Sequence, residues 1–544
     1  MVRTISVAAK LALLSSLLLA ASCSNVETPD LKADVEREKI IPPGWQPVPL
    51  RVGIAPMRAA LELDERRYNV DDTKRWVLTP DEQRLNGPGG LNQQLIATLR
   101  DYHMFEYVAT IDGASASTSR EDLQNMALRQ GLDVVVVPTV KRQDVGYVDS
   151  NAAYGWNMFV WWMVSPIFSW FIADEDFDAN LHIDMRMYPT SRDAELLATR
   201  LQPPQTIVRS LDDWDHGFNL FAMFSTPGYM GEDNWKKVGG LLMPIAENEA
   251  KKSMLRFVTQ DLSRKVAEES FREAVRRRVG LVIGVDGTGQ PPVPLTRFAS
   301  ADAESLASQL LEAENDRVPE AALRTLLGPR ATRRSVEQAA DELATMARGN
   351  DDLFVVFTGV GMLDDTLRPT LVLAQPGGQK AETIALADLL DRLAVNKPRT
   401  ITLLLDCSFA APGDRRCATS APQLEKLLAT QPGKSLFLPL QAQMAQAGIG
   451  CVILSATDGM PGNPHGMKAL EIEDLGHGLF SAFAVEALAG KADTSGDRQV
   501  TVEEFRKYVG DKVKRIAELE GESQRGYFSL SDSRKGYTLP AMRR

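Results

Sequence analysis

Residues 280–286 read GLVIGVD, a continuous apolar run that ends in an aspartate. Two more runs of this kind follow, LFVVF at 353–357 and ITLLL at 401–405, and helical patterns at 301–310 and 332–343 separate the first run from the second. Strands that are apolar at every position are buried on both faces. Alternating strands and helices predict an α/β domain with a mostly parallel sheet and helices on both faces. Ligands bind such sheets at the carboxyl ends of the strands.

Five short motifs lie between residue 278 and residue 544. They are LVIG at 281–284, ADA at 301–303, ATR at 331–333, GHGLF at 476–480 and GKAD at 490–493. Together they resemble the caspase-like fold of bacterial caspase homologues and metacaspases. The resemblance implies a peptidase fold in which a catalytic histidine and a catalytic cysteine each follow a buried strand.

The chain departs from this family at the catalytic pair. The family's histidine lies in a Ser-Gly-His-Gly motif and its cysteine in an Asp-x-Cys motif. Here the two places read TGVG at 358–361 and DCS at 406–408, so Val360 and Ser408 stand at the catalytic positions. Valine cannot transfer a proton, and a serine without an adjacent base is a poor nucleophile. We therefore expect a pseudoenzyme, a catalytically inactive domain that acts by binding.

Two alternatives keep the domain active. A shifted register would make Cys407 the nucleophile of a peptidase that cleaves after arginine or lysine, although neighbouring strand side chains point to opposite faces. Serine hydrolase chemistry at Ser408 is the weaker alternative, because His477 belongs to a non-catalytic motif of the family and His465 has no motif support. The family's equivalent of Asp406 lines a pocket for a basic side chain. This residue therefore implies a remnant pocket, or it only holds a loop.

The stretch 493–504 has the ligand spacing of an EF-hand loop. The candidate calcium ligands are Asp493, Ser495, Asp497, Gln499 and Glu504. Arg498 replaces the glycine that makes the sharp turn of such loops. Calcium binding and a cap for the helix that starts at Val502 are the two interpretations, and no other cofactor is predicted.

The N-terminus has the pattern of a secretory signal. Basic residues precede the apolar run 11–21, which is too short to span a bilayer. The run ends in LAASC at 19–23, which resembles the lipobox of bacterial lipoproteins, with Ala20 in place of the usual leucine. The resemblance implies acylation (palmitate) of Cys23, and the alternative is an ordinary cleaved signal peptide. Because Ser24 is not the aspartate of inner-membrane retention, we expect a lipid anchor in the outer membrane, facing the periplasm.

The chain is predicted to have five parts. Residues 1–22 are the signal peptide and residues 23–48 are a polar, proline-containing tether. Residues 49–205 form a smaller α/β (α+β) domain, which loosely resembles periplasmic lipoproteins related to the curli-secretion lipoprotein. Residues 206–277 are a connector with an amphipathic helix, and residues 278–544 are the caspase-like domain. The resemblance of 49–205 is the only indication of a further class, an oligomeric secretion or envelope assembly component.

The segment from Tyr154 to Ala173 has no charged residue and contains half of the chain's eight tryptophans. About 20 uncharged residues are long enough for a membrane helix, but Pro166 favours a broken element. Tryptophan favours the membrane–water interface. We expect a hairpin that enters the membrane or joins subunits, and the alternative is packing under its own domain.

Composition and charge limit the function classes. The chain has 544 residues, 44% hydrophobic and 24% charged, which excludes a wholly disordered or fibrous protein. Its net charge of -11 excludes sequence-independent binding of nucleic acid. Four cysteines cannot frame a disulfide scaffold, although Cys407 and Cys417 could pair in an oxidising periplasm. The expected partners are the membrane, a peptide or protein of unknown identity, and further copies of the chain.

Overall fold

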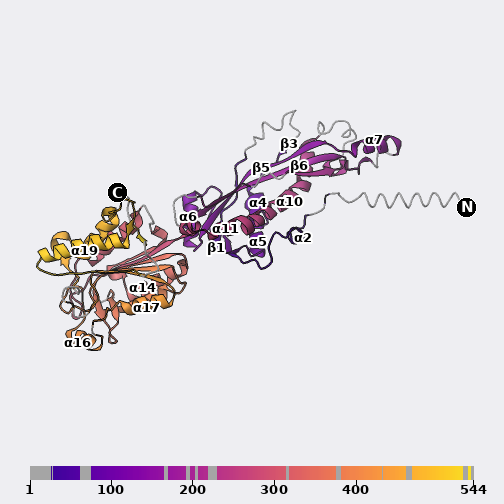
Figure 1. The fold of residues 1–544 in the computed structure, drawn as a ribbon. Coiled ribbons are helices and arrows are strands. Elements are labelled where there is room, and N and C mark those ends of the chain that lie inside the picture. The colour runs from indigo at the N-terminus through magenta and orange to yellow at the C-terminus, as the bar shows by residue number, and fades with distance from the viewer. Residues whose placement is uncertain are drawn as a thin grey trace. The chain divides into compact units, whose positions relative to one another are not determined.

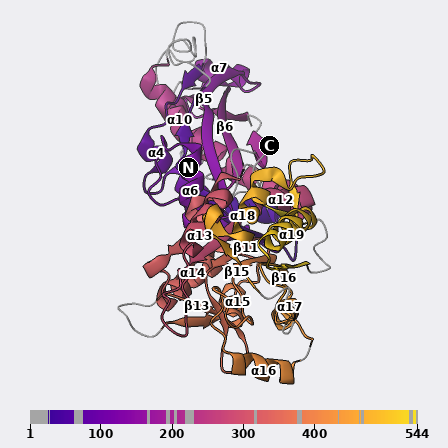
Figure 2. The same ribbon diagram turned by 90° about the vertical axis from the view of Figure 1, so that its left-hand side faces the viewer.

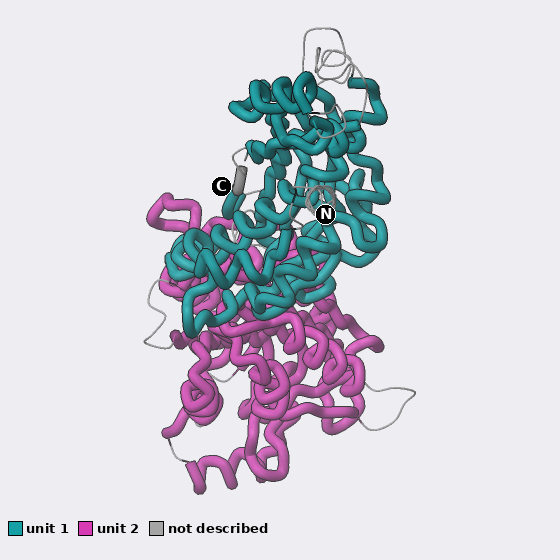
Figure 3. Tube along the Cα trace, turned by 90° about the vertical axis from the view of Figure 1, so that its right-hand side faces the viewer, with its two compact units in different colours: residues 1–274 teal, residues 275–544 magenta. Residues whose placement is uncertain are grey.

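The chain divides into two compact units, residues 1–274 and residues 275–544 (Figure 3). The computed structural model describes residues 26, 29–61, 75–164, 169–190, 196–201, 206–217, 230–313, 318–374, 381–431, 433–460, 463, 468–530 and 537–540. Within these residues, no helix has the length and apolar character needed to cross a membrane. The predicted signal peptide and Cys23 lie outside the described residues, as do Pro166 and His465.

Unit 1 is built on a mixed sheet of eight described strands. They are β1 (Val48–Ile54), β2 (Arg58–Ala59), β3 (Arg75–Val77), β4 (Phe105–Thr110), β5 (Val134–Ser150), β6 (Glu175–Pro189), β7 (Ala198–Leu201) and β8 (Ile207–Leu211). The central order is β4-β1-β5-β6-β7. β1 pairs in parallel with β4 and β5, whereas β5 and β6 form a long antiparallel ribbon. The valine run at the start of β5 is mostly buried, as expected for a strand covered on both faces.

The helices of unit 1 include one that sequence analysis assigned to a connector. The described helices are α2 (Leu31–Arg37), α4 (Glu82–Asn86), α5 (Leu91–Asp101), α6 (Arg120–Arg129), α7 (Tyr154–Met163), α9 (Asp213–His216), α10 (Glu232–Arg256), the π-helical η2 (Phe257–Leu262), α11 (Ser263–Ala267) and α12 (Glu269–Val275). α10 packs against β6 and β5 and buries Val238, Leu242 and Leu255. The structure therefore places α10 inside unit 1, because the apolar stripe of an amphipathic helix is stabilised by burial against a sheet.

Unit 2 has a six-stranded sheet in the order β10-β9-β11-β15-β16-β20. The strands are β9 (Arg278–Gly284), β10 (Leu323–Leu327), β11 (Asp352–Thr358), β15 (Thr400–Asp406), β16 (Gly450–Ser455) and β20 (Tyr527–Leu530). All neighbours pair in parallel except β16 and β20. β9, β11 and β15 are buried at every position. The predicted fold class, α/β with a mostly parallel sheet, is confirmed.

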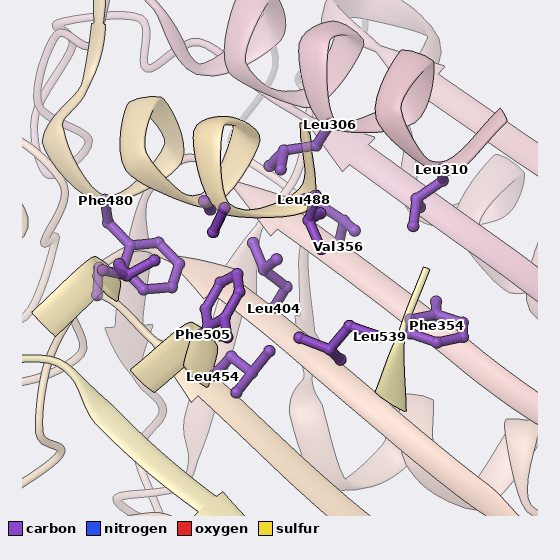
Figure 4. Packing of buried hydrophobic residues seen from close by; sticks show 14 of the residues in the cluster. Leu306, Leu310, Phe354, Val356, Leu404, Leu454, Phe480, Leu488, Phe505 and Leu539 are labelled. Atoms are coloured by element: carbon purple, nitrogen blue, oxygen red, sulfur yellow. The ribbon is translucent and has the colours of Figure 1, made fainter. Parts of the chain in front are cut away.

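Helices cover both faces of this sheet. The described α-helices of unit 2 are α13 (Ala299–Glu312), α14 (Arg333–Met346), α15 (Leu386–Leu393), α16 (Ala421–Thr430), α17 (Leu438–Gln446), α18 (Leu479–Glu486) and α19 (Val502–Leu519), of which α16 lies apart from the sheet (Figure 2). Leu306 of α13, Phe480 of α18 and Phe505 of α19 share one buried cluster with Leu404 and Leu454 of the sheet (Figure 4). α14 and α17 lie on the other side of the sheet from α19 (Figure 1), and Figure 2 shows the helices on both sides of β11 and β15.

Candidate functional site

The candidate site of unit 2 lies where β11 and β15 end side by side, with Thr358 opposite Asp406. Past these ends, the N–H groups of Gly361 and Ser408 both donate to the carbonyl oxygen of Arg416, each at 3.0 Å. The N–H of Ala418 donates in turn to the carbonyl of Gly361 at 2.8 Å. The chain around Arg416 therefore joins the two loops that would carry a catalytic pair.

Val360 is buried at this edge in a small apolar cluster with Val293, Val372 and Ala418. It also lines a cavity of about 370 Å³, whose other walls come from the loops that follow β9 and β10 and from one strand of the small sheet that follows β11. That small sheet consists of β12 (Gly361–Leu363), β13 (Pro369–Val372) and β14 (Thr383–Ala385). Val360 thus contributes apolar contacts and no proton-transfer group to this edge of the sheet.

Cys407 and Ser408 are both fully buried. Burial, and then the charge of Asp406, raises the pKa of the Cys407 thiol well above its usual range. The nucleophilic form of cysteine is the thiolate, and a buried thiol of raised pKa is inert. Cys407, Cys417 and Cys451 are free thiols in this structure. The geometry therefore gives Cys407 the surroundings of a structural residue.

Asp406 binds an arginine of the same chain. The guanidinium of Arg416 lies 3.0 Å from the carboxylate of Asp406, 2.8 Å from that of Asp302 and 3.0 Å from that of Glu471. All four side chains are fully buried. The hydroxyl of Ser481 donates a further bond to Asp406 at 2.6 Å. The carboxylate that the resemblance assigns to a pocket for a ligand's basic side chain is thus paired with an arginine of the same chain in this structure.

This ionic cluster extends to the β-bridge formed by β17 (Glu471–Ile472) and β18 (His477–Gly478). Nδ1 of His477 lies 2.8 Å from Asp302. Burial raises the pKa of Asp302 to about 6, against the opposing charge of Arg416. A Cβ on Gly478 would lie 2.5 Å from Asp406 Oδ2 and 2.6 Å from Arg416 Nη2. The cluster therefore needs glycine at that position.

In the EF-hand-like loop, Glu504 bonds to backbone groups of its own chain. Its Oε1 accepts from the N–H of Ser495 at 3.0 Å, and its Oε2 accepts from the N–H of Thr501 at 3.0 Å. The second bond is half of a capping box at the start of α19. Although burial opposes it, these bonds lower the pKa of Glu504 to about 2. Glu504, the last of the five candidate calcium ligands, therefore caps a helix in this structure.

The other predicted calcium ligands also have local partners. Asp493 Oδ2 accepts from the N–H of Arg498 at 2.9 Å, and Asp497 Oδ1 accepts from the N–H of Gln499 at 2.9 Å. Arg498 adopts a φ of 65°, the left-handed conformation for which an EF-hand uses glycine. In the part of the chain that the structure describes, no group of three or more His, Cys, Asp or Glu side chains could hold a metal ion. This geometry favours the helix-cap interpretation.

A second candidate surface lies on α7 of unit 1, at one end of the β5–β6 ribbon (Figure 1). Its large exposed apolar side chains are those of Trp156, Phe159, Trp162 and Met163, continued by Val164. Trp156 and Trp162 are 62% and 66% exposed, and Trp156 stacks on Phe159 with ring centroids 5.3 Å apart. Asn157 and Val160 on the same helix are buried. We call the exposed side chains the aromatic face of α7.

The sequence alone does not identify the partners on which the site in unit 2 depends. Arg416 lies in the loop after β15, outside every motif of the resemblance, and Asp302 belongs only to the motif at the start of a helix. The signal available was the pair Arg415 and Arg416 in the loop that follows the predicted pocket aspartate. Nothing in the sequence connects Glu471 to this cluster, because its contacts come from distant parts of the chain.

No family model matches the chain, and no curated protein is similar to it. Among solved structures, a structural-genomics protein of Geobacter sulfurreducens has 14% identity, with 49% of this chain and 94% of that one covered and a TM-score of 0.30. Caspase-1 of Spodoptera frugiperda has 12% identity, with 47% and 86% covered and a TM-score of 0.28. A hypothetical protein of Chlamydia trachomatis has 11% identity, with 40% and 99% covered and a TM-score of 0.18. The α/β fold class rests on the strand pairing described above.

Proposed function

We propose that this protein is a non-catalytic, membrane-attached scaffold of the bacterial cell envelope. Unit 2 is an inactive caspase-like module, and α7 of unit 1 docks on the membrane–water interface. The aromatic face of α7 is the observation that carries the docking function. Acylation of Cys23, as the lipobox resemblance implies, would provide a separate anchor in the outer membrane.

The chemistry of the aromatic face suits a lipid interface. Monomeric soluble proteins rarely leave large contiguous apolar patches in water. Tryptophan is enriched at membrane interfaces because its ring is apolar and its N–H is polar. No charged residue lies between 150 and 173, so no charge has to leave water when the face enters the headgroup region. Complete burial of one large apolar side chain contributes about 1.5–3 kcal/mol, so partial burial of five contributes several kcal/mol.

The flanking charges select the lipid class. Asp149 precedes the uncharged segment, and Asp174, Glu175 and Asp176 follow it. Acidic flanks are repelled by anionic lipids, and no lysine or arginine lies between residues 149 and 176 to attract them. We therefore expect docking on zwitterionic phosphatidylcholine that changes little with ionic strength.

Docking is tested with a fluorophore attached to the whole chain in a Cys23→Ser background. The three remaining cysteines are buried, so a Met163→Cys variant labels the aromatic face, and a Leu519→Cys variant labels an equally exposed position on α19. Phosphatidylcholine vesicles should shift the emission of the first label to shorter wavelength and leave the second unchanged. Adding Trp156→Ser and Trp162→Ser should abolish the shift. No shift with vesicles, or a shift that follows protein concentration without vesicles, would contradict membrane docking; the second outcome would favour the assembly function.

The absence of catalysis is supported by Val360, by the buried thiol of Cys407 and by the arginine that fills the site at Asp406. We expect no turnover of peptide reporters with arginine or lysine at the cleavage site, in reducing buffer with or without calcium. The protein and its Cys407→Ala and Ser408→Ala variants should be indistinguishable. Turnover lost on Cys407→Ala would make the protein a cysteine peptidase, and turnover lost on Ser408→Ala would make it a serine hydrolase.

A further inference from the structure

α7 is attached to the sheet of unit 1 through a buried pair of polar side chains. Nδ2 of Asn157 donates to Oδ2 of Asp174 at 2.8 Å. Asn157 is 1% exposed and Asp174 is 2% exposed. The other oxygen of each group, Oδ1 of Asn157 and Oδ1 of Asp174, is buried and has no hydrogen-bond partner among the described residues. A buried acceptor without a donor is unfavourable. One additional hydrogen, shared between the two Oδ1 atoms, would give both of them a hydrogen bond.

We propose that Asp174 is protonated when α7 is held against the sheet, with the proton on Oδ1 donated to Oδ1 of Asn157. The proton comes from solvent and turns one acceptor into a donor, so that the carboxylic acid and the carboxamide exchange two hydrogen bonds. Loss of the proton leaves two acceptors facing each other and releases the helix. We call the paired side chains of Asn157 and Asp174 the latch. The latch makes the position of the aromatic face of α7 sensitive to pH, and its consequence for membrane docking rests on the proposed function.

The charges around Asp174 favour its neutral form. Nε2 of His216 lies 3.1 Å from Glu175 and 3.4 Å from Asp213. Although burial opposes it, these two carboxylates raise the pKa of His216 to about 9, so the imidazolium neutralises charge on its own neighbours. No cation among the described residues pairs with Asp174. Burial first, and then the charges of Glu175 and Asp213, raises the pKa of Asp174 to about 7, against the bond from Asn157.

Other titratable groups face this cluster from each element around it. They are Tyr147 and Asp149 on β5, Tyr154 on α7, Asp176 on β6, Asp212 and Asp215 at α9, and Lys237 on α10, whose Nζ donates to the carbonyl of Trp214. The carboxylates outnumber the cations in this set. Their combined charge acts in the same direction as burial and favours the proton on Asp174.

The sign of the pH dependence follows from linkage. In the held state the pKa of Asp174 is about 7, whereas a released helix exposes the carboxyl to water, where the pKa is about 3.9. At a pH between these two pKa values, Asp174 is protonated in the held state and ionised in the released state. The latch is fully made below about pH 4, and the population of released helix rises about tenfold per pH unit until about pH 7. Above that pH it levels off.

Membrane docking should follow the latch. A held helix presents its aromatic face in one orientation, whereas a released helix does not. Protonation of Asp174 therefore favours the docked state. Docking is therefore tighter at pH 5 than at pH 8.

Amide hydrogen exchange on the whole chain, without vesicles, tests the latch directly. Protection factors of the α7 amides should fall by about tenfold per pH unit between pH 5 and pH 7. In Asp174→Asn the new amide supplies the missing hydrogen at every pH, so protection should be high and flat. Asp176→Asn is the matched control and should keep the slope. The proposal would be overturned if the α7 protection factors of the parent protein did not change with pH, or if they still fell with pH in Asp174→Asn.

A second variant, Asn157→Asp, tests the latch independently if Asp174→Asn does not fold. Asn157→Asp places two carboxyls in contact, and such a pair shares one proton. Release should then continue to rise above pH 7, where the parent has levelled off, and an unchanged profile would contradict the latch. The Met163→Cys label separates this proposal from the proposed function. If the protection factors of α7 change with pH but the protein does not dock on vesicles, the membrane function is wrong and the latch stands. If the protein docks on vesicles but neither the protection factors nor the docking affinity change with pH, the latch is wrong and the membrane function stands.

Discussion

Removal of the positive charge of Arg416 is the sharpest perturbation of unit 2. The Arg416→Met variant keeps most of the side-chain volume and deletes the guanidinium. At contact distances of 2.8–3.0 Å, each of its three ion pairs is worth roughly 5 kcal/mol before desolvation at an effective dielectric constant of about 20. Most of this is cancelled by the desolvation of the four groups and by repulsion among the carboxylates. Breaking a buried ionic cluster from one side typically costs about 3–5 kcal/mol, and we expect a loss of this size at pH 7.

The cysteines provide an assay that reports on unit 2 alone. Cys407, Cys417 and Cys451 are buried there, so in a Cys23→Ser background thiol labelling against denaturant follows the unfolding of this unit. The Arg416→Met variant should unfold at lower denaturant concentration. The difference should shrink at pH 5, where Asp302, with a pKa near 6 even beside the arginine, takes up a proton.

A triple variant distinguishes loss of charge balance from loss of packing. Adding Asp302→Asn and Asp406→Asn to Arg416→Met removes two of the carboxylates that the arginine neutralises. This combination should recover part of the lost stability. A loss below about 1 kcal/mol in the single variant, the range of an exposed ion pair, or no recovery in the triple variant would refute the reasoning.

Three other predictions concern unit 2. Gly478→Ala should lower the free energy of unfolding by about 1–3 kcal/mol, because its Cβ would meet Asp406 and Arg416. Gly510→Ala, where a Cβ would be 3.8 Å from its neighbour, should not destabilise, and equal losses in the two would contradict the packing argument. Glu504 has a pKa of about 2, below its ordinary value of about 4.3, so its stabilising effect is present above that pH and is lost as the pH falls toward 2. The gap in thermal midpoint between the protein and Glu504→Gln should close over that range, and calcium should leave the midpoint of the protein unchanged; a constant gap or a rise with calcium would argue for a different role. Iodoacetamide at pH 8 should leave Cys407 unmodified in the native state, and fast modification seen by mass spectrometry would show a reactive thiol.

The sheet of unit 2 was predictable because its strands are continuous apolar runs. β9, β11 and β15 are buried on both faces, so local composition alone marks them. The ionic cluster was not predictable in the same way. Arg416 contacts Asp302 from 114 residues away and Glu471 from 55 residues away, and no local periodicity connects such positions.

In unit 1, too, the sequence identifies elements without identifying the residues that they contact. The uncharged segment that starts at Tyr154 was visible in the sequence, but its attachment through Asn157 to Asp174 depends on how the chain turns between β5 and β6. The amphipathic pattern of α10 was also visible. The surface that α10 covers was not, because a hydrophobic stripe identifies a buried face without identifying its partner.

The β5–β6 ribbon sets the distance between α7 at one of its ends and β1, which pairs with the start of β5, at the other. β6 has 15 residues and β5 has 17, and at about 3.3 Å per residue the ribbon spans roughly 50 Å. Side chains along a strand alternate with a period of two, so removing two residues from each strand would shorten the ribbon by about 7 Å and keep every remaining side chain on its own face. Removing one residue from each would turn the faces over. The ribbon is thus a spacer between α7 and β1, and the side chains keep their faces only when its length changes by two residues in each strand.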